Sequence, residues 1–212
     1  MGHMRAASPI EDFLQVLLDR WRSMGWLEVV TTAIIALCVL AIFISIVINF
    51  VECSRTPAKT VKRSIVATGT MSLFFMLFYL LLRFRVGALD MGSFPVRIAL
   101  AVAGLALMVA GCCVNIAGRL SLGRNWANQV TIYADQRLVT GGVYRLVRHP
   151  LYASLIWMFF GASLVYENMA ALLANALVFL PFMTYRARQE EKLLMREFKE
   201  YAEYRARVGM FL

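Results

Sequence analysis

The stretch from Leu27 to Val51 reads LEVVTTAIIALCVLAIFISIVINFV, and it decides the class of fold. It carries a single charge, Glu28, near its start. A helix of about 20 apolar residues crosses the roughly 30 Å hydrocarbon core of a bilayer, so this stretch is long enough to span a membrane. Of the 212 residues, 60% are hydrophobic, whereas soluble domains average about 45–50%. The sequence therefore predicts an integral membrane protein.

Four further apolar stretches follow the first one along the chain. They lie at residues 65–82, 98–117, 151–166 and 168–185. We therefore expect an all-α, multi-pass membrane protein with about five transmembrane helices. The last two stretches are separated only by Glu167-Asn168, which predicts a tight helical hairpin. Pro181 removes a backbone donor inside the last helix, and we expect a kink there.

The charged segments complete the predicted organisation. We expect the chain to divide into a cloning scar at 1–4, an interfacial amphipathic segment at 5–26, three spans at 27–117, and a last region at 118–212 with two spans and a C-terminal helix. Within the three spans, Gly104 and Gly111 favour close helix packing. Residues 186–207 are expected to form one charged amphipathic helix, with an apolar stripe of Leu194, Phe198 and Tyr201.

Lysine and arginine collect in three of the connecting segments. Residues 52–64 carry four, 118–150 carry five and 186–212 carry seven, whereas 1–26 and 83–97 carry three each. With five spans, the three richer segments lie on one side of the membrane, and the positive-inside rule assigns that side to the cytoplasm. Contact with anionic lipid headgroups then accounts for the net charge of +9, and nucleic acid is not an expected partner.

Polar side chains concentrate where the fourth span begins and where the fifth span ends. The first group is Arg148-His149-Pro150-Leu151-Tyr152, which follows the flexible pair Gly141-Gly142. The second group is Arg186-Ala187-Arg188-Gln189-Glu190-Glu191. Because the two spans form a hairpin, we expect these two groups to be neighbours on the cytoplasmic side.

The residue types in these groups favour a ligand with separate positive and negative ends. Pro150 suits the first turn of a helix, and the free N–H groups there, together with Arg148 and His149, favour an anion. Arg186 and Glu190 are four residues apart and share a helix face, so Glu190 offers a carboxylate to a cation. The same residues are also compatible with binding of lipid phosphate and with an ordinary helix ion pair.

The cysteines indicate neither a metal site nor disulfides. Cys38, Cys53, Cys112 and Cys113 lie within or at the end of apolar spans and form no C-x-x-C pattern. His149 has no second histidine or cysteine near it in the sequence. We interpret the cysteines as small apolar side chains, and we expect no metal.

Four motifs follow one another between about residues 119 and 207. They are Leu122-Gly123-Arg124-Asn125-Trp126, Leu138-Val139-Thr140-Gly141-Gly142-Val143-Tyr144, Arg148-His149-Pro150-Leu151-Tyr152, and Arg186-x-x-x-Glu190-Glu191-x-x-Leu194-x-x-x-Phe198-x-x-Tyr201-x-x-Tyr204. In this order they resemble the isoprenylcysteine carboxyl methyltransferase family, within the wider group of membrane phospholipid methyltransferases. The first 118 residues are similar only in being membrane helices.

This resemblance implies an S-adenosylmethionine-dependent enzyme that methylates a lipid-like or prenylated acceptor, most simply the carboxylate of an isoprenylcysteine. The implied cofactor contacts are Leu138, Val139, Gly142, Tyr144, Arg148, His149, Tyr152, Glu190 and Glu191. The implied catalytic residues are Arg186, which would orient a carboxylate, and Glu190, which would be the base for an amine acceptor. Oligomeric state is not addressed by any of these motifs.

Two positions depart from the family pattern, and they bear on the acceptor more than on the cofactor. Ser154 stands where a small glycine-type residue is frequent, and Lys199 follows Phe198 where glycine is usual. Three other functions stay open. The first is phospholipid N-methylation, and the second is NADPH-dependent reduction, because membrane sterol reductases carry a stretch similar to Arg148–Tyr152. The third is a membrane scaffold without catalytic activity.

Overall fold

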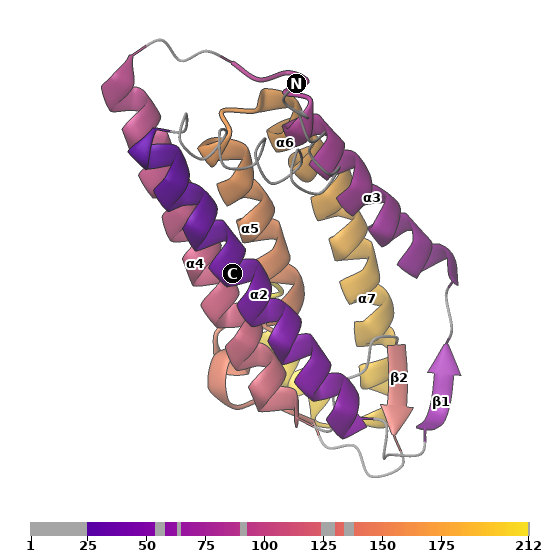
Figure 1. Ribbon diagram of the computed structural model, residues 1–212. Helices are drawn as coiled ribbons and strands as arrows, with labels where there is room; N and C mark the ends of the chain where they lie inside the picture. Colours follow the sequence, from indigo (N-terminus) through magenta and orange to yellow (C-terminus); the bar gives the residue numbers. More distant parts are fainter. Residues whose placement is uncertain are drawn as a thin grey trace, which may run out of the picture.

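The structure is a computed structural model that describes residues 25–53, 58–62, 65–89, 93–123, 130–133 and 138–211. Its long apolar helices run along one another in a bundle (Figure 1). They are α2 (Trp26–Cys53), α3 (Ile65–Arg83), α4 (Phe94–Leu122), α5 (Pro150–Val165), and a last helix made of α6 (Met169–Ala174), the π-helical turn η3 (Asn175–Phe179) and α7 (Leu180–Glu197). The shorter elements are β1 (Ala58–Lys62), β2 (Val130–Tyr133), the 3₁₀ turn η2 (Gly142–Arg145) and α8 (Tyr201–Arg207).

The predicted all-α, multi-pass membrane fold is confirmed. Among the described residues, three helices are long and apolar enough to cross a membrane, namely Trp26–Asn49, Phe94–Leu122 and Met169–Glu197, while α3 and α5 are shorter apolar helices. The number of spans therefore stays a prediction.

Helix α4 runs from Phe94 to Leu122 and so extends beyond the predicted 98–117 at both ends. Pro95 suits the first turn of the helix, and Gly123 caps its end. The expected interfacial helix within 5–26, and Arg124, Asn125 and Trp126, lie outside the described residues.

Helices α4 and α5 form the closest helix pair of the bundle. A Cβ atom added to Gly104 would lie 2.5 Å from the carbonyl oxygen of Gly161, and one added to Gly111 would lie 2.8 Å from the carbonyl oxygen of Ser154. The two backbones therefore touch where side chains are missing, as is usual between helices in membranes. The predicted role of Gly104 and Gly111 in close packing is confirmed.

A buried chain of hydrogen bonds reinforces this contact and continues to α2. Asn115 donates to the Ser154 hydroxyl at 2.7 Å, and Arg119 donates from Nε to Asn115 Oδ1 at 2.9 Å. The Asn49 amide of α2 lies 3.4 Å from the carbonyl oxygen of Arg119. Ser154, which departs from the family pattern, therefore joins α5 to α4 through a bond that glycine cannot make.

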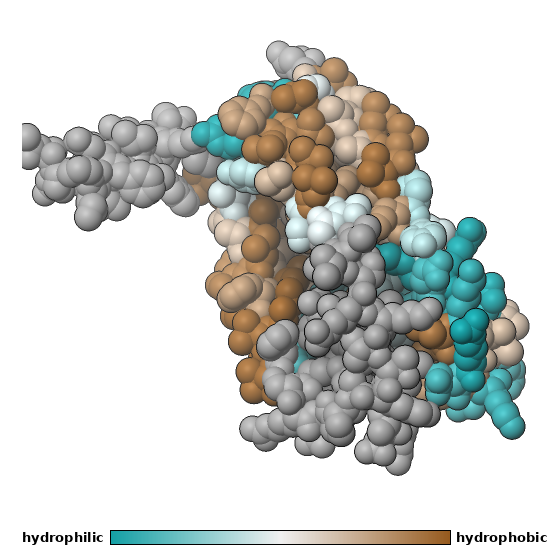
Figure 2. All heavy atoms as spheres, turned by 90° about the vertical axis from the view of Figure 1, so that its right-hand side faces the viewer, coloured by the Kyte–Doolittle hydropathy of each residue, from teal (hydrophilic) through white to brown (hydrophobic). Residues whose placement is uncertain are grey.

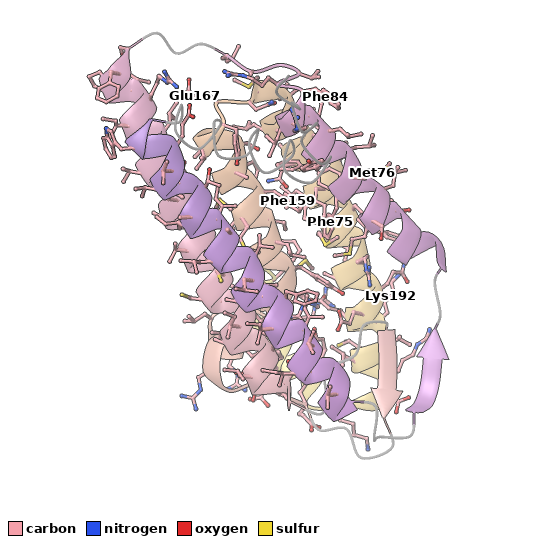
Figure 3. All side chains as sticks on the ribbon, viewed as in Figure 1. Phe75, Met76, Phe84, Phe159, Glu167 and Lys192 are labelled. Carbon is pink, nitrogen blue, oxygen red and sulfur yellow. The ribbon has the colours of Figure 1, made fainter. Side chains whose placement is uncertain are left out.

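Aromatic rings join α3 to the rest of the bundle. Phe74 stacks on Phe179 with ring centres 4.6 Å apart, and both rings contact Phe159 of α5. Phe75 of α3 also contacts Phe159, with centres 5.3 Å apart, and Figure 3 shows these two side chains between the two helices. Such ring contacts add to the stability that burial provides.

The predicted hairpin of the last two helices is confirmed. Glu167 adopts a left-handed φ of 48°, and Asn168 caps the next helix by accepting a hydrogen bond from Ala171 N at 2.8 Å. The sequence did not predict the π turn at Asn175–Phe179, which comes just before Pro181 and changes the backbone bonding pattern locally. The expected kink at Pro181 stays a prediction.

Residues 186–207 do not form the single amphipathic helix that was predicted. Residues 186–197 instead prolong α7 beyond its apolar part, and Phe198 has an extended backbone, with φ −122° and ψ 111°, that ends the helix. The separate helix α8 then begins at Tyr201, so Leu194, Phe198 and Tyr201 do not share one helix face. The sequence also did not predict the antiparallel pairing of β1 with β2, which joins two connecting segments at one end of the bundle.

Substitution of Gly161 by alanine should destabilise the bundle, because the new Cβ would lie 2.5 Å from the carbonyl oxygen of Gly104. Overpacking of this kind costs about 1–3 kcal/mol. Gly69 of α3 is the matched control, since a Cβ there meets nothing within 4 Å, and alanine favours a helix over glycine. We expect thermal unfolding in detergent to give a lower Tm for Gly161→Ala and an equal or higher Tm for Gly69→Ala. Equal Tm values for the two variants would contradict the close packing of α4 on α5.

Candidate functional site

The predicted polar groups come together at the charged end of α7. Glu167 marks one end of the bundle and Lys192 marks the charged part of α7 towards the other end (Figure 3). Figure 2 shows hydrophobic residues over the upper part of one face and hydrophilic residues gathered at its lower right. The hairpin of α5 and the last helix brings the start of α5 beside residues 186–191 of α7, as the sequence predicted.

Glu191 is the centre of this polar cluster. Its carboxylate is 3% exposed, and Oε1 accepts hydrogen bonds from Arg148 Nε at 2.8 Å and lies 3.2 Å from His149 Nε2. Its second oxygen lies 3.4 Å from Arg205 Nε of α8. One carboxylate therefore connects α7, the segment that leads into α5, and the C-terminal part of the chain.

The surroundings of Glu191 keep its carboxylate ionised. Burial by itself would raise the pKa of this carboxyl, but hydrogen bonds from His149 and Arg148 outweigh it and lower the pKa to about 2. Glu191 lies in the charged extension of α7, beyond the apolar part of that helix. The charge of Glu191 is therefore present throughout the neutral and mildly acidic range.

Arg148 holds the C-terminal tail against the start of α5. Its Nη1 donates to the carbonyl oxygens of Arg205, at 2.8 Å, and Val208. The backbone N–H groups of Arg148 and His149 donate to the carbonyl oxygens of the tail residues 209 and 210, at 2.9 and 3.2 Å. The guanidinium that the sequence suggested for an anion is thus occupied by the protein's own carbonyls and by Glu191.

Glu190 belongs to a second, more accessible group. Tyr152 donates from its hydroxyl to Glu190 Oε2 at 3.0 Å, and His149 Nδ1 lies 3.7 Å from the same oxygen. The rings of His149 and Tyr152 are nearly parallel, with centres 5.6 Å apart. The Glu190 side chain is 36% exposed, whereas Glu191 is buried, so the two adjacent carboxylates differ in their access to a ligand.

Arg186 also lies beside Tyr152. Its guanidinium carbon is 5.9 Å from the centre of the Tyr152 ring, and Nη1 lies 3.4 Å from the sulfur of Met71 in α3. In the part of the chain that the structure describes, no carboxylate pairs with Arg186, and the ion pair with Glu190 that the sequence allowed is not formed. Tyr152 therefore lies beside both predicted catalytic residues.

The motif before Arg148 borders the same cluster, because Tyr144 lies within electrostatic reach of Glu190 and Tyr152. Gly142 has a φ of +60°, and a Cβ there would lie 2.7 Å from Ser121 Oγ, so the turn requires glycine for both reasons. Tyr144 is buried, and its carbonyl oxygen accepts a hydrogen bond from the Tyr204 hydroxyl at 2.6 Å. Burial is the main cause that raises the pKa of Tyr144 well above its usual value. Leu138 and Val139 are half-buried beside this turn.

The sequence did not identify Tyr201, Tyr204 and Arg205 as part of the site. Tyr201 is 1% exposed, and its hydroxyl has no hydrogen-bond partner among the residues that are described. Both tyrosines stand in the fourth motif, but Tyr201 was interpreted as part of the apolar stripe and Tyr204 was assigned no role. Only the break at Phe198 turns these residues back onto Glu191 and the turn at Tyr144.

Replacing Glu191 by glutamine should destabilise the protein, because Arg148 then loses its buried counter-charge, a loss that typically costs about 3–5 kcal/mol. Since the folded pKa of about 2 lies below that of a free glutamate, the stabilisation is complete above about pH 5 and disappears as the pH falls towards 2. We expect the difference in Tm between wild type and Glu191→Gln to be constant from pH 6 to 8 and to shrink below pH 5. The exposed Glu200→Gln is the control, and a pH-independent difference would contradict the assignment.

Comparison with known proteins supports the resemblance found in the motifs. Residues 103–196 match the model of the isoprenylcysteine carboxyl methyltransferase family. A probable protein-S-isoprenylcysteine O-methyltransferase of Oryza sativa subsp. indica is 33% identical over 108 residues, which cover 50% of this chain and 56% of the relative. The protein-S-isoprenylcysteine O-methyltransferase of Saccharomyces cerevisiae is 32% identical over 112 residues, covering 51% and 47%. The chain thus spans about half the length of the curated relatives it matches.

One further relative and one solved structure are also similar to this chain. The cobalt-zinc-cadmium resistance protein CzcN of Cupriavidus metallidurans is 30% identical over 120 residues, covering 55% of this chain and 49% of the relative. A solved structure of the eukaryotic intramembrane Ras methyltransferase, an isoprenylcysteine carboxyl methyltransferase, aligns with a TM-score of 0.52 and 25% identity, covering 72% of this chain and 54% of that chain. The resemblance predicted from the sequence is thereby confirmed, and residues 103–196 carry the sequence pattern of the isoprenylcysteine carboxyl methyltransferase family.

Proposed function

We propose that this protein is an S-adenosylmethionine-dependent membrane methyltransferase that methylates the carboxylate of a lipophilic, isoprenylcysteine-like acceptor. The observation that carries the proposal is the state of Arg186. This guanidinium has a thioether and an aromatic ring as neighbours, and no described carboxylate neutralises it. It lies beside Tyr152 and Glu190, at the start of the family's charged motif, where it is available to an anionic acceptor.

The residues at the site fit the proposed cofactor. S-adenosylmethionine supplies an electrophilic methyl group on a sulfonium when it is bound. Its amino-acid and ribose groups need hydrogen-bonding partners, and the site offers the partly exposed Glu190 and the ring of His149. A partly exposed carboxylate suits a polar ligand with a positive group. Glu190, His149 and Tyr152 would hold the cofactor, with Leu138, Val139, Gly142 and Tyr144 beside them.

The division of roles among the charged residues follows from their partners. Arg148 and Glu191 neutralise each other and hold the fold of the site, so we assign them to positioning the cofactor contacts, His149 above all. Arg186 would bind the acceptor carboxylate through two parallel N–H bonds and orient it. A carboxylate is nucleophilic without losing a proton, so this reaction needs no base, and the protein contributes alignment in a site that excludes water.

The proposed placement in the membrane follows the same geometry. The positively charged segments 52–64, 118–150 and 186–212 are the richest in lysine and arginine, and the pairing of β1 with β2 supports a common side for the first two. We infer that this side is cytoplasmic. The apolar tail of the acceptor would reach Arg186 from the bilayer, and membrane lipids surround the helices.

Purified protein in detergent should bind S-adenosylmethionine saturably and should not bind NADPH, as measured by isothermal calorimetry. Glu190→Gln removes the accessible carboxylate and should weaken this binding about 10-fold or more, because a charge-assisted bond contributes about 1.5–3 kcal/mol. Glu197→Gln, on the exposed end of the same helix, should bind as the wild type does. Binding of NADPH alone would favour the membrane reductases, and binding of neither would favour a scaffold.

Arg186→Ala should slow methyl transfer strongly while leaving cofactor affinity within about 3-fold, because only the acceptor loses its partner. We expect a loss of about 100-fold in kcat/KM for S-farnesylcysteine with a blocked amino group, since two charge-assisted bonds disappear. Arg188→Ala is the matched control, an exposed arginine two residues along α7. Transfer is followed with methyl-labelled cofactor, and a methyl ester releases its label in mild base. Label that resists base and resides on a phospholipid amine would instead establish N-methylation.

A further inference from the structure

We propose that Tyr201 is a further cofactor-binding residue, whose buried hydroxyl forms a hydrogen bond with a polar group of S-adenosylmethionine. The inference rests on the proposed function, and it assigns a ligand contact to α8, which lies outside residues 103–196 of the family match.

The first observation is an unpaired polar group in a buried position. Tyr201 is 1% exposed and is among the largest fully buried side chains of the protein. Its hydroxyl finds no hydrogen-bond partner among the described residues. A buried hydroxyl normally has a partner, because leaving it without one sacrifices the hydrogen bonds it made with water. A native group of this kind therefore indicates a partner other than the described residues of the chain.

The second observation is the direction in which α8 faces the site. Tyr201 and Arg205 are one turn apart on α8 and so share a helix face. Arg205 Nε lies 3.4 Å from Glu191 Oε2, and the carbonyl oxygen of Arg205 accepts a bond from Arg148. The face that carries Tyr201 is therefore the one turned to Glu191, next to the accessible Glu190.

The third observation is the contrast with Tyr204, which neighbours Tyr201 on the same short helix. The two rings are 5.8 Å apart and both are buried, but the Tyr204 hydroxyl donates to the carbonyl oxygen of Tyr144 at 2.6 Å. Tyr204 thus has a complete structural role, namely to join α8 to the turn at Gly142–Arg145. Tyr201 has equivalent burial without such a bond, so its hydroxyl is available to a ligand.

The surroundings also set the chemical state of the hydroxyl. Burial, with a further contribution from the negative charge of Glu191, raises the pKa of Tyr201 above its usual value. The phenol therefore stays neutral at every working pH, and it can donate one hydrogen bond and accept others. A neutral phenol beside carboxylates suits the amino or hydroxyl groups of a nucleoside joined to an amino acid.

The test compares Tyr201→Phe with the matched control Tyr204→Phe in the full chain. Each substitution removes one hydroxyl and keeps the ring. Calorimetry measures the Kd for S-adenosylmethionine, and thermal unfolding without ligand measures Tm. We expect Tyr201→Phe to weaken binding about 5- to 15-fold and to leave Tm unchanged or higher, because the hydroxyl is unpaired in the free protein. We expect Tyr204→Phe to lower Tm by roughly 2–4 °C and to change Kd by less than about 2-fold.

Each contrary result has a separate meaning. If Tyr201→Phe binds the cofactor as tightly as wild type does, the hydroxyl is not a ligand contact, and the proposed function stands without it. If Tyr201→Phe lowers Tm as Tyr204→Phe does, the hydroxyl serves the fold, and the inference is overturned. If wild type itself does not bind S-adenosylmethionine, the proposed function fails, and the inference fails with it.

Discussion

The buried carboxylate of Glu191 is the interaction on which the arrangement of the site depends. A buried charge is tolerated only when partners replace its lost hydration, and Glu191 has three: Arg148, His149 and Arg205. These partners come from the start of α5 and from α8, while Glu191 itself comes from α7. The requirement to satisfy one carboxylate therefore brings together segments that are more than forty residues apart in the sequence.

Because Glu191 requires a buried counter-charge, the two arginines of the site, Arg148 and Arg186, differ in their partners. Arg148 is committed to Glu191 and to the carbonyl oxygens of the tail, so its charge is balanced within the fold. Arg186 has Met71 and Tyr152 as its neighbours, and the proposed function assigns its charge to the acceptor carboxylate. The same distinction applies to the carboxylates, because Glu191 is enclosed while Glu190 is partly exposed. Residues that are adjacent or alike in the motif thus differ in function because their partners differ.

The membrane part supplies the rigidity that such a site needs. Gly104 and Gly111 let α4 touch the backbone of α5, and Asn115 binds Ser154 inside this contact. The start of α5, which carries Tyr152, is therefore held by a helix whose backbone touches that of α5. A site built on rigid helices keeps its geometry better than one built on loops, and close alignment is the main contribution expected of a methyl-transferring protein.

The sequence by itself determined the membrane class, the helical hairpin, the close-packing glycines and the meeting of the two charged motifs, because these follow from hydrophobic length, local caps and chain direction. It also carried the family motifs. It did not determine the partners of Arg148 and Arg186, the π turn before Pro181, or the end of α7 at Phe198. Those features depend on which buried polar groups form hydrogen bonds with one another between segments that are distant in the sequence. A polar residue in a motif is the same letter in the sequence whether its hydrogen-bond partner is a ligand or the protein. Only the tertiary structure distinguished the paired hydroxyl of Tyr204 from the unpaired hydroxyl of Tyr201, because burial and hydrogen bonding are properties of the folded neighbourhood and not of the residue.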